Sequence, residues 1–150
     1  MSTRSLTTFI ETFKNKDKDC SEEIATMYRQ SDGYPSGMGK DLAEFLIDGR
    51  LVNGISINEK GVVYNGMGCL AAQVVAHFKK GAGGIYLQRK NKNSGEEYRY
   101  IIIGDFDTKT ITMEVNEVGY MEGNKYINKT RCIFSGTPRE FTDSQFSKRE

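Results

Sequence analysis

The 150-residue sequence contains no tryptophan, a single histidine and only two prolines. Its three cysteines, Cys20, Cys69 and Cys132, lack Cys-x-x-Cys spacing, which argues against a zinc site or a disulfide framework. It has no run of about 18 apolar residues and no signal-like apolar segment at its start. We therefore expect a soluble, cytoplasmic protein with no membrane partner, no metal and no bound cofactor.

The sequence also lacks an excess of charge of either sign. It has 21 basic and 20 acidic residues, a formal charge of +1, which offers no electrostatic footprint for duplex nucleic acid. Hydrophobic residues make up 37% and charged residues 27% of the chain, as in ordinary globular proteins. We expect one domain spanning residues 1–150.

Short β-branched and aromatic runs separated by turn residues predict a largely antiparallel sheet. Residues 4–13 and 22–30 read as an antiparallel pair around a charged turn at 14–19, and residues 55–64 as a hairpin. Further strands are predicted at 84–90, 96–104 and 110–118, arranged as a meander, and at 131–136.

Two main helices and a short third one complete the predicted elements. Met38, Leu42, Phe45 and Leu46 form one helical stripe that ends near Gly49, and residues 65–80 repeat this pattern. Residues 137–140 read Thr-Pro-Arg-Glu, a capping box that predicts a terminal helix ending near residue 146. The order of elements predicts an α+β fold with both main helices packed on the sheet.

The segment "RQSDGYPSGMGK" places three glycines before the first helix, which invites two interpretations. Glycine N–H groups at a helix start could cradle a phosphate, with Arg29 and Lys40 as cations. Alternatively the segment is a turn, Lys40 points to solvent, and Arg29 pairs with Asp32 or Asp41. The Walker A spacing is absent, so an NTPase is excluded.

A second glycine loop, "NGMGCLAAQ" at residues 65–73, repeats this design before the second helix. Two helix starts converging on one crevice would suit a ligand with two phosphates, although two independent turns would look the same in sequence. No catalytic constellation accompanies the loops. His77 is expected to be partly buried beside the apolar stripe, and the Glu22-Glu23 and Glu96-Glu97 pairs point to opposite strand faces.

The stretch "YRQSDGYPSGMGKDLAEFL" resembles a widespread set of small, largely uncharacterised phage and prophage proteins. An aromatic strand that runs into Asp-Gly-Tyr-Pro, a spaced glycine and a helix beginning with leucine carry the likeness. The later "VNGI", "NGMGCLAAQ" and "FSGTPREF" are similar to the same set. The resemblance implies a phage protein acting in the cytoplasm of an infected bacterium, and supplies no activity of its own.

Several unrelated small phage proteins sequester nucleotide signals of host immunity, and by this analogy we expect a nucleotide-binding sponge. Its ligand would be a cyclic dinucleotide or a cyclic ADP-ribose derivative, bound within one chain or between the subunits of a homo-oligomer. The alternatives are a phosphodiesterase acting on such nucleotides and an interaction module that inhibits a host factor. The predicted ligand-binding residues are Tyr28, Arg29, Asp32, Gly33, Tyr34, Ser36, Gly37, Gly39, Lys40, Asn65, Gly66 and Gly68.

Overall fold

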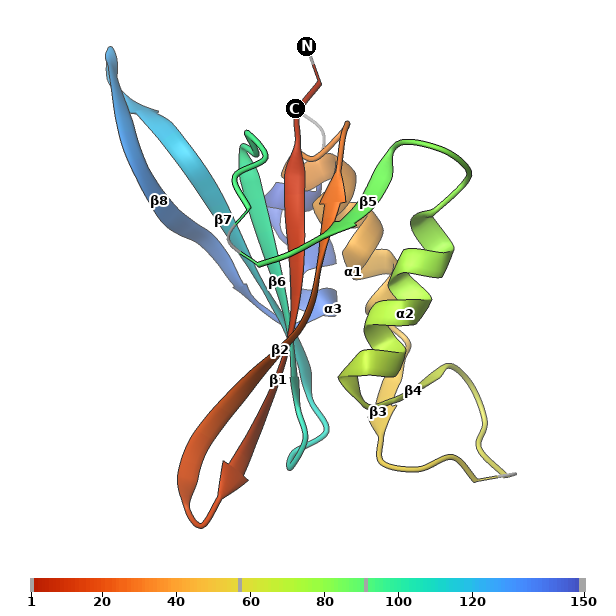
Figure 1. Cartoon of the computed structure of the whole chain (residues 1–150). Coiled ribbons are helices and arrows are strands. Elements are labelled where there is room, and N and C mark those ends of the chain that lie inside the picture. Colours follow the sequence, from red (N-terminus) through yellow and green to blue (C-terminus); the bar gives the residue numbers. More distant parts are fainter. Residues whose placement is uncertain (1, 57, 91, 149–150) are drawn as a thin grey trace.

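The computed structural model describes residues 2–56, 58–90 and 92–148. Six strands form one sheet in the order β5-β2-β1-β6-β7-β8, in which only β1 and β6 run parallel (Figure 1). The predicted α+β class with a largely antiparallel sheet is confirmed. The strands are β1 (Ser5–Asn15), β2 (Lys18–Arg29), β5 (Ile85–Gln88), β6 (Tyr98–Asp105), β7 (Ile111–Glu122) and β8 (Lys125–Gly136).

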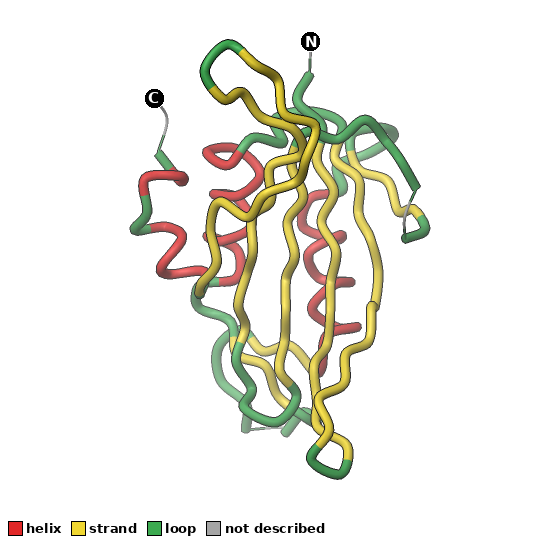
Figure 2. The backbone as a smooth tube through the Cα atoms, turned by 90° about the vertical axis from the view of Figure 1, so that its left-hand side faces the viewer, coloured by secondary structure: helices red, strands yellow, loops and turns green. Residues whose placement is uncertain are grey.

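The helices lie on one face of this sheet. Figure 2 shows the strands in front and the helices behind them, so the front face carries no helix of the described chain. The helical segments are η1 (Pro35–Gly39, a π-helix), α1 (Lys40–Leu46), α2 (Gly66–Phe78), α3 (Pro138–Thr142) and η2 (Gln145–Ser147, a 3-10 helix).

The hydrophobic core lies between the helices and the inner face of the sheet. Phe9, Tyr100, Ile102 and Val115 on the strands are fully buried, as is Leu70 of α2. Their strand neighbours alternate in exposure, because successive side chains of a strand point to opposite faces. The outer face of the sheet therefore presents every second residue of β1, β6 and β7 away from the helices.

The predicted meander is only half right. β6, β7 and β8 are consecutive neighbours, whereas β5 pairs with β2 at the far edge of the sheet. The chain between β5 and β6, predicted as a local turn, crosses the width of β2 and β1, about 14 Å at the usual strand spacing. Turn residues mark where a strand ends, but they do not specify which distant strand it joins.

The hairpin predicted at residues 55–64 is wrong. β3 (Arg50–Val52) and β4 (Val63–Asn65) pair in parallel, so the intervening segment is an excursion rather than a tight turn. Arg50 supports it by hydrogen bonds to Glu59 Oε2 and to the Lys60 carbonyl, both of 3.0 Å. Ile55 and Val62, the apolar residues that suggested strands, are 67% and 49% exposed.

Other boundaries differ in length rather than in kind. The charged turn predicted at 14–19 narrows to Lys16 and Asp17, which adopt left-handed φ values of 52° and 64°. β7 and β8 continue outward into a long hairpin that turns near Gly123, beyond the predicted strand ends. At the C-terminal end, the predicted capping box of Thr137 and Glu140 is confirmed.

Candidate functional site

The first glycine loop uses its backbone donors within the chain. The Gly33 N–H donates to the Thr3 carbonyl and the Gly37 N–H to the Tyr34 carbonyl, both at 2.9 Å. The Met38 N–H donates to the Asp32 carbonyl, also at 2.9 Å. These groups are therefore already satisfied, and a phosphate would have to displace protein hydrogen bonds to reach them.

Close packing explains the glycines of this segment, of which Gly37 and Gly39 lie in η1 and not in a loop. A Cβ atom at Gly33 would lie 2.8 Å from Ser5 Cβ, and one at Gly37 would lie 2.5 Å from the Asp32 carbonyl oxygen. A Cβ at Gly39 would lie 2.8 Å from Phe141 Cζ. Asp32 itself adopts a left-handed φ of 56°. The loop geometry thus fits the turn interpretation, in which glycine allows backbone to approach neighbouring elements.

The two cations of the loop have protein partners. Arg29, whose side chain is 17% exposed, bonds Asp41 Oδ2 at 3.2 Å and lies 5.9 Å from the centre of the Phe78 ring. The alternative pairing of Arg29 with Asp41 is thereby confirmed. Lys40 forms a 3.8 Å ion pair with Glu44, and both side chains are about half exposed.

The predicted aromatic and polar residues of the first loop lie in two separate places. Tyr28 packs against Tyr86 on the helix-free sheet face, with ring centroids 5.8 Å apart. Tyr34 donates from its hydroxyl to Asp32 Oδ1 at 3.3 Å, and with Ser36 it borders a hollow beside η2. The structure does not bring Tyr28 and Tyr34 to one surface.

The second glycine loop lies at the other end of the sheet from the first. Gly66 is next to the carboxylate of Glu11, whereas Gly33 packs on Ser5, and these two β1 residues are roughly 20 Å apart along the strand. The prediction of one shared crevice is therefore wrong. Asn65 accepts a hydrogen bond from the Gly54 N–H at 2.8 Å, and Gly68 lies within α2 with open space around it.

His77 is exposed rather than partly buried. Its ring packs 4.5 Å from that of Phe45 and 4.8 Å from that of Phe78, measured between centroids. The side chain thus caps an aromatic cluster at the edge of the helical layer.

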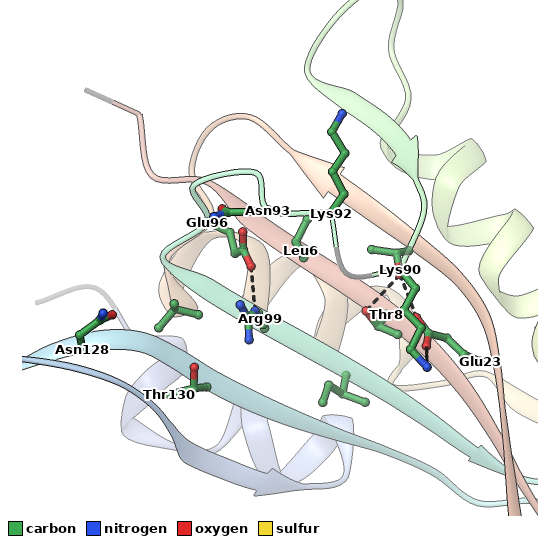
Figure 3. A pocket seen from close by; sticks show the side chains of 13 residues that line it. Leu6, Thr8, Glu23, Lys90, Lys92, Asn93, Glu96, Arg99, Asn128 and Thr130 are labelled. Atoms are coloured by element: carbon green, nitrogen blue, oxygen red, sulfur yellow. Dashed lines mark hydrogen bonds and ion pairs between the residues drawn. The ribbon is translucent and has the colours of Figure 1, made fainter.

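A polar hollow of about 600 Å³ lies on the helix-free face of the sheet (Figure 3). Lys92, Asn93 and Glu96, which lie between β5 and β6, form one wall, and residues of β7 and β8 form the opposite wall. Its volume falls in the range of small-molecule sites. The lining residues are Leu6, Thr8, Glu23, Thr26, Lys90, Lys92, Asn93, Glu96, Arg99, Ile101, Val118, Asn128 and Thr130.

Arg99 is the best-prepared cation of this hollow. Its Nε donates to Glu96 Oε2 at 2.8 Å, and the Glu96 side chain is only 4% exposed. Glu96 also accepts from the Ser94 N–H at 3.2 Å, which fixes the carboxylate from a second side. Within the described chain, the two terminal nitrogens of Arg99 have no hydrogen-bond partner, so they are available to a ligand.

A chain of hydrogen bonds occupies the other end of the hollow. The hydroxyls of Thr8 and Thr26 are 3.3 Å apart, and Thr26 donates to Glu23 Oε1 at 3.2 Å. Lys90 pairs with Glu23 Oε2 at 3.1 Å. Figure 3 shows Lys92 extending away from the other labelled side chains. Lys90 is therefore engaged and Lys92 is peripheral, which leaves Arg99, whose side chain is 46% exposed, as the cation with free donors at the hollow.

Apolar side chains form part of the floor between these ends. Leu6, Ile101 and Val118 come from β1, β6 and β7 and contribute the apolar part of the lining. Asn128 and Thr130 of β8 add neutral hydrogen-bonding groups beside them. An anionic group facing Arg99 and a flat, partly apolar body on the floor would together match these surroundings.

None of the predicted ligand-binding residues lines this hollow. The signal that could have found it is the alternation in β6, where Arg99 and Ile101 occupy one face and the buried Tyr100 and Ile102 the other. The pairing of Leu6 with Arg99 across parallel strands completes the floor, and such a pairing is not visible in a single sequence.

Comparisons with protein families, curated proteins and solved structures gave no match to this chain. Over the residues that the structure describes, no helix is long and apolar enough to cross a membrane. The same residues contain no group of three or more histidine, cysteine or acidic side chains placed to hold a metal ion.

Proposed function

We propose that this protein binds a small phosphorylated, nucleotide-like ligand in the hollow on the helix-free face of the sheet, and releases it unchanged. The observation that carries the proposal is the Glu96–Arg99 pair. A buried carboxylate holds Nε and leaves the terminal nitrogens of the guanidinium unpaired beside an apolar floor. This arrangement suits bidentate recognition of a phosphate, with little side-chain entropy left to lose.

Binding without turnover is supported by the state of the two carboxylates. Glu96 faces Arg99 and Glu23 faces Lys90, so each acid is held by a cation instead of facing open solvent as a free proton acceptor. The resemblance to phage proteins directs the choice of ligand. In this proposal the protein sequesters a nucleotide signal of the host, of the cyclic dinucleotide or cyclic ADP-ribose type.

Isothermal titration calorimetry against cyclic dinucleotides, ADP-ribose derivatives and the neutral nucleoside adenosine tests this proposal. We expect saturable binding of at least one phosphorylated compound and none of adenosine. Arg99→Ala removes a charged hydrogen bond worth about 1.5–3 kcal/mol, which weakens binding by about ten- to hundred-fold. Lys109→Ala, in the turn between β6 and β7, is the control and leaves binding unchanged.

Mass spectrometry of the ligand recovered after denaturation separates a sponge from an enzyme. Intact nucleotide supports sequestration, and fragments support the phosphodiesterase alternative. Absence of binding across the panel at high protein concentration would overturn the proposal.

A further inference from the structure

The two edges of the sheet differ in how they are protected against further pairing. β8 carries Lys125, Lys129 and Arg131, and its pairing with β7 is interrupted by two register shifts. Charges and bulges of this kind discourage the addition of another strand. β5, at the opposite edge, reads Ile-Tyr-Leu-Gln and has no charged residue.

The outer side of β5 has free backbone groups at its centre. The Gln30 N–H donates to the Gly84 carbonyl at 2.8 Å, so Gly84 faces β2. In an antiparallel ladder alternate residues face alternate sides, which directs the N–H and C=O of Ile85 and Leu87 outward. The Ile85 carbonyl accepts from Lys79 Nζ at 2.7 Å, whereas the described residues offer the outward groups of Leu87 no partner.

Exposed side chains accompany this free edge. Leu87 is 65% exposed, and Tyr86, on the other face of the strand, is 46% exposed. Lys79 places its ammonium 5.3 Å from the centre of the Tyr86 ring and also bonds the Gly83 carbonyl, so it braces the start of β5. These contacts of Lys79 therefore fix the start of β5 in the absence of a partner.

The charge around β5 indicates what kind of partner fits. Residues 79–92 contain five basic residues and no acidic one: Lys79, Lys80, Arg89, Lys90 and Lys92. A second copy of this chain paired antiparallel on β5 would bring the cations that precede one strand beside those that follow the other. Like charges so placed are repulsive, whereas a segment with acidic ends is attracted.

We propose that the outer edge of β5 binds an extended segment of a partner protein whose apolar centre is flanked by aspartate and glutamate. The segment adds a seventh strand to the sheet and pairs with the backbone of Leu87. The inference does not require nucleotide binding, because Leu87 does not line the hollow, although Lys90 and Lys92 belong both to the basic flank of β5 and to the lining of the hollow.

The test uses a fluorescently labelled peptide of alternating valine and threonine with aspartate and glutamate at both ends. We expect saturable binding by fluorescence anisotropy and slower hydrogen exchange of the Leu87 amide in the complex. Leu87→Asp places a negative charge at the edge, which repels the acidic peptide, and we expect it to weaken binding by about tenfold or more. Met121→Asp is the matched control, because Met121 on the β7–β8 hairpin is 59% exposed and lies far from β5 in the strand order.

Three outcomes would overturn this inference. The first is that the acidic peptide shows no saturable binding. The second is that Leu87→Asp and Met121→Asp lose peptide affinity equally. The third is that a peptide with lysine at both ends binds as tightly as the acidic peptide. A single-stranded oligothymidylate that binds and protects the same Leu87 amide would instead assign the basic edge to nucleic acid. A far-ultraviolet circular dichroism spectrum and a thermal unfolding midpoint like those of the wild type would show that Leu87→Asp is folded.

Discussion

The buried hydroxyl of Tyr100 donates a 2.6 Å hydrogen bond to the carbonyl of Gly33 and so ties the first glycine loop to the centre of the sheet. The two residues lie 67 positions apart in the sequence. Tyr100 is fully buried, and Gly33 in turn donates to the Thr3 carbonyl. The loop that resembles a phosphate cradle is thus anchored from two sides as part of the core.

Tyr100→Phe is expected to destabilise the protein by about 1–3 kcal/mol, because it leaves the buried Gly33 carbonyl without its partner. Urea unfolding followed by circular dichroism measures this loss. Tyr28→Phe is the control, since Tyr28 lies partly exposed on the outer face of the sheet and its hydroxyl makes no hydrogen bond within the described chain. Equal stability of Tyr100→Phe and the wild type would contradict the anchoring described above.

The same hydroxyl predicts a pH dependence. Burial raises the pKa of Tyr100 well above 10.0, and the nearby Tyr98 adds to this rise. In the unfolded chain the Tyr100 hydroxyl ionises at its ordinary pKa, whereas in the folded chain it keeps its proton to higher pH. The stability contributed by this group is therefore present below pH 10 and decreases as the pH rises further.

Unfolding midpoints measured from about pH 8 to about pH 11 test this dependence. The wild type should lose stability more steeply than Tyr100→Phe above pH 10, since the variant has no hydroxyl to ionise at this position. Parallel curves for the two proteins would show that Tyr100 does not cause the loss.

Two glycines in the predicted ligand loops should respond to alanine in opposite directions. Gly39→Ala forces a methyl group against Phe141 and Tyr100 and is expected to cost about 1–3 kcal/mol. Gly68→Ala adds a methyl group to open space in α2 and is expected to stabilise by about 0.5–1 kcal/mol. Thermal unfolding of both variants checks the signs, and a destabilised Gly68→Ala would count against a purely helical role for this residue.

Alanine substitutions of Arg29 and Lys40 should have different effects on the stability of the protein. Arg29→Ala removes a largely buried guanidinium from Asp41 and Phe78 and is expected to destabilise by about 0.5–3 kcal/mol. Lys40→Ala removes one member of an exposed ion pair and should change the stability by no more than about 0.5 kcal/mol. Neither change should alter nucleotide binding, and a binding loss in the folded Lys40→Ala variant would favour the loop over the hollow.

The sequence is most informative about the fold where its signals are local. The stripe of Leu42, Phe45 and Leu46 and the capping box of Thr137 predict two helices that form, although the terminal helix ends at Thr142 and not near residue 146. The position of β5 beside β2 and the parallel pairing of β3 with β4 could not be read in this way. Both pairings join segments that are distant in the sequence, so no local pattern of residues specifies them.

The candidate site shows the same limit. The glycines of the first loop suggested a ligand because glycine is needed wherever any group approaches the backbone closely. The approaching groups are Ser5, the Asp32 carbonyl and Phe141 of the chain itself. Arg99, by contrast, is one basic residue in an ordinary strand. Its significance depends on the burial of Glu96 and on the parallel pairing of β6 with β1, which places Arg99 beside Leu6.

The central claim is the position of the ligand site, and backbone amide shifts in a ¹H–¹⁵N correlation spectrum test it most directly. On titration with the tightest-binding nucleotide from calorimetry, we expect the largest shifts at Arg99, Ile101, Asn128 and Thr130, and their loss in Arg99→Ala. Amides of residues 33–40 should remain unshifted. The largest shifts at residues 33–40 or 65–68, or no shift at any residue of the hollow, would contradict the account.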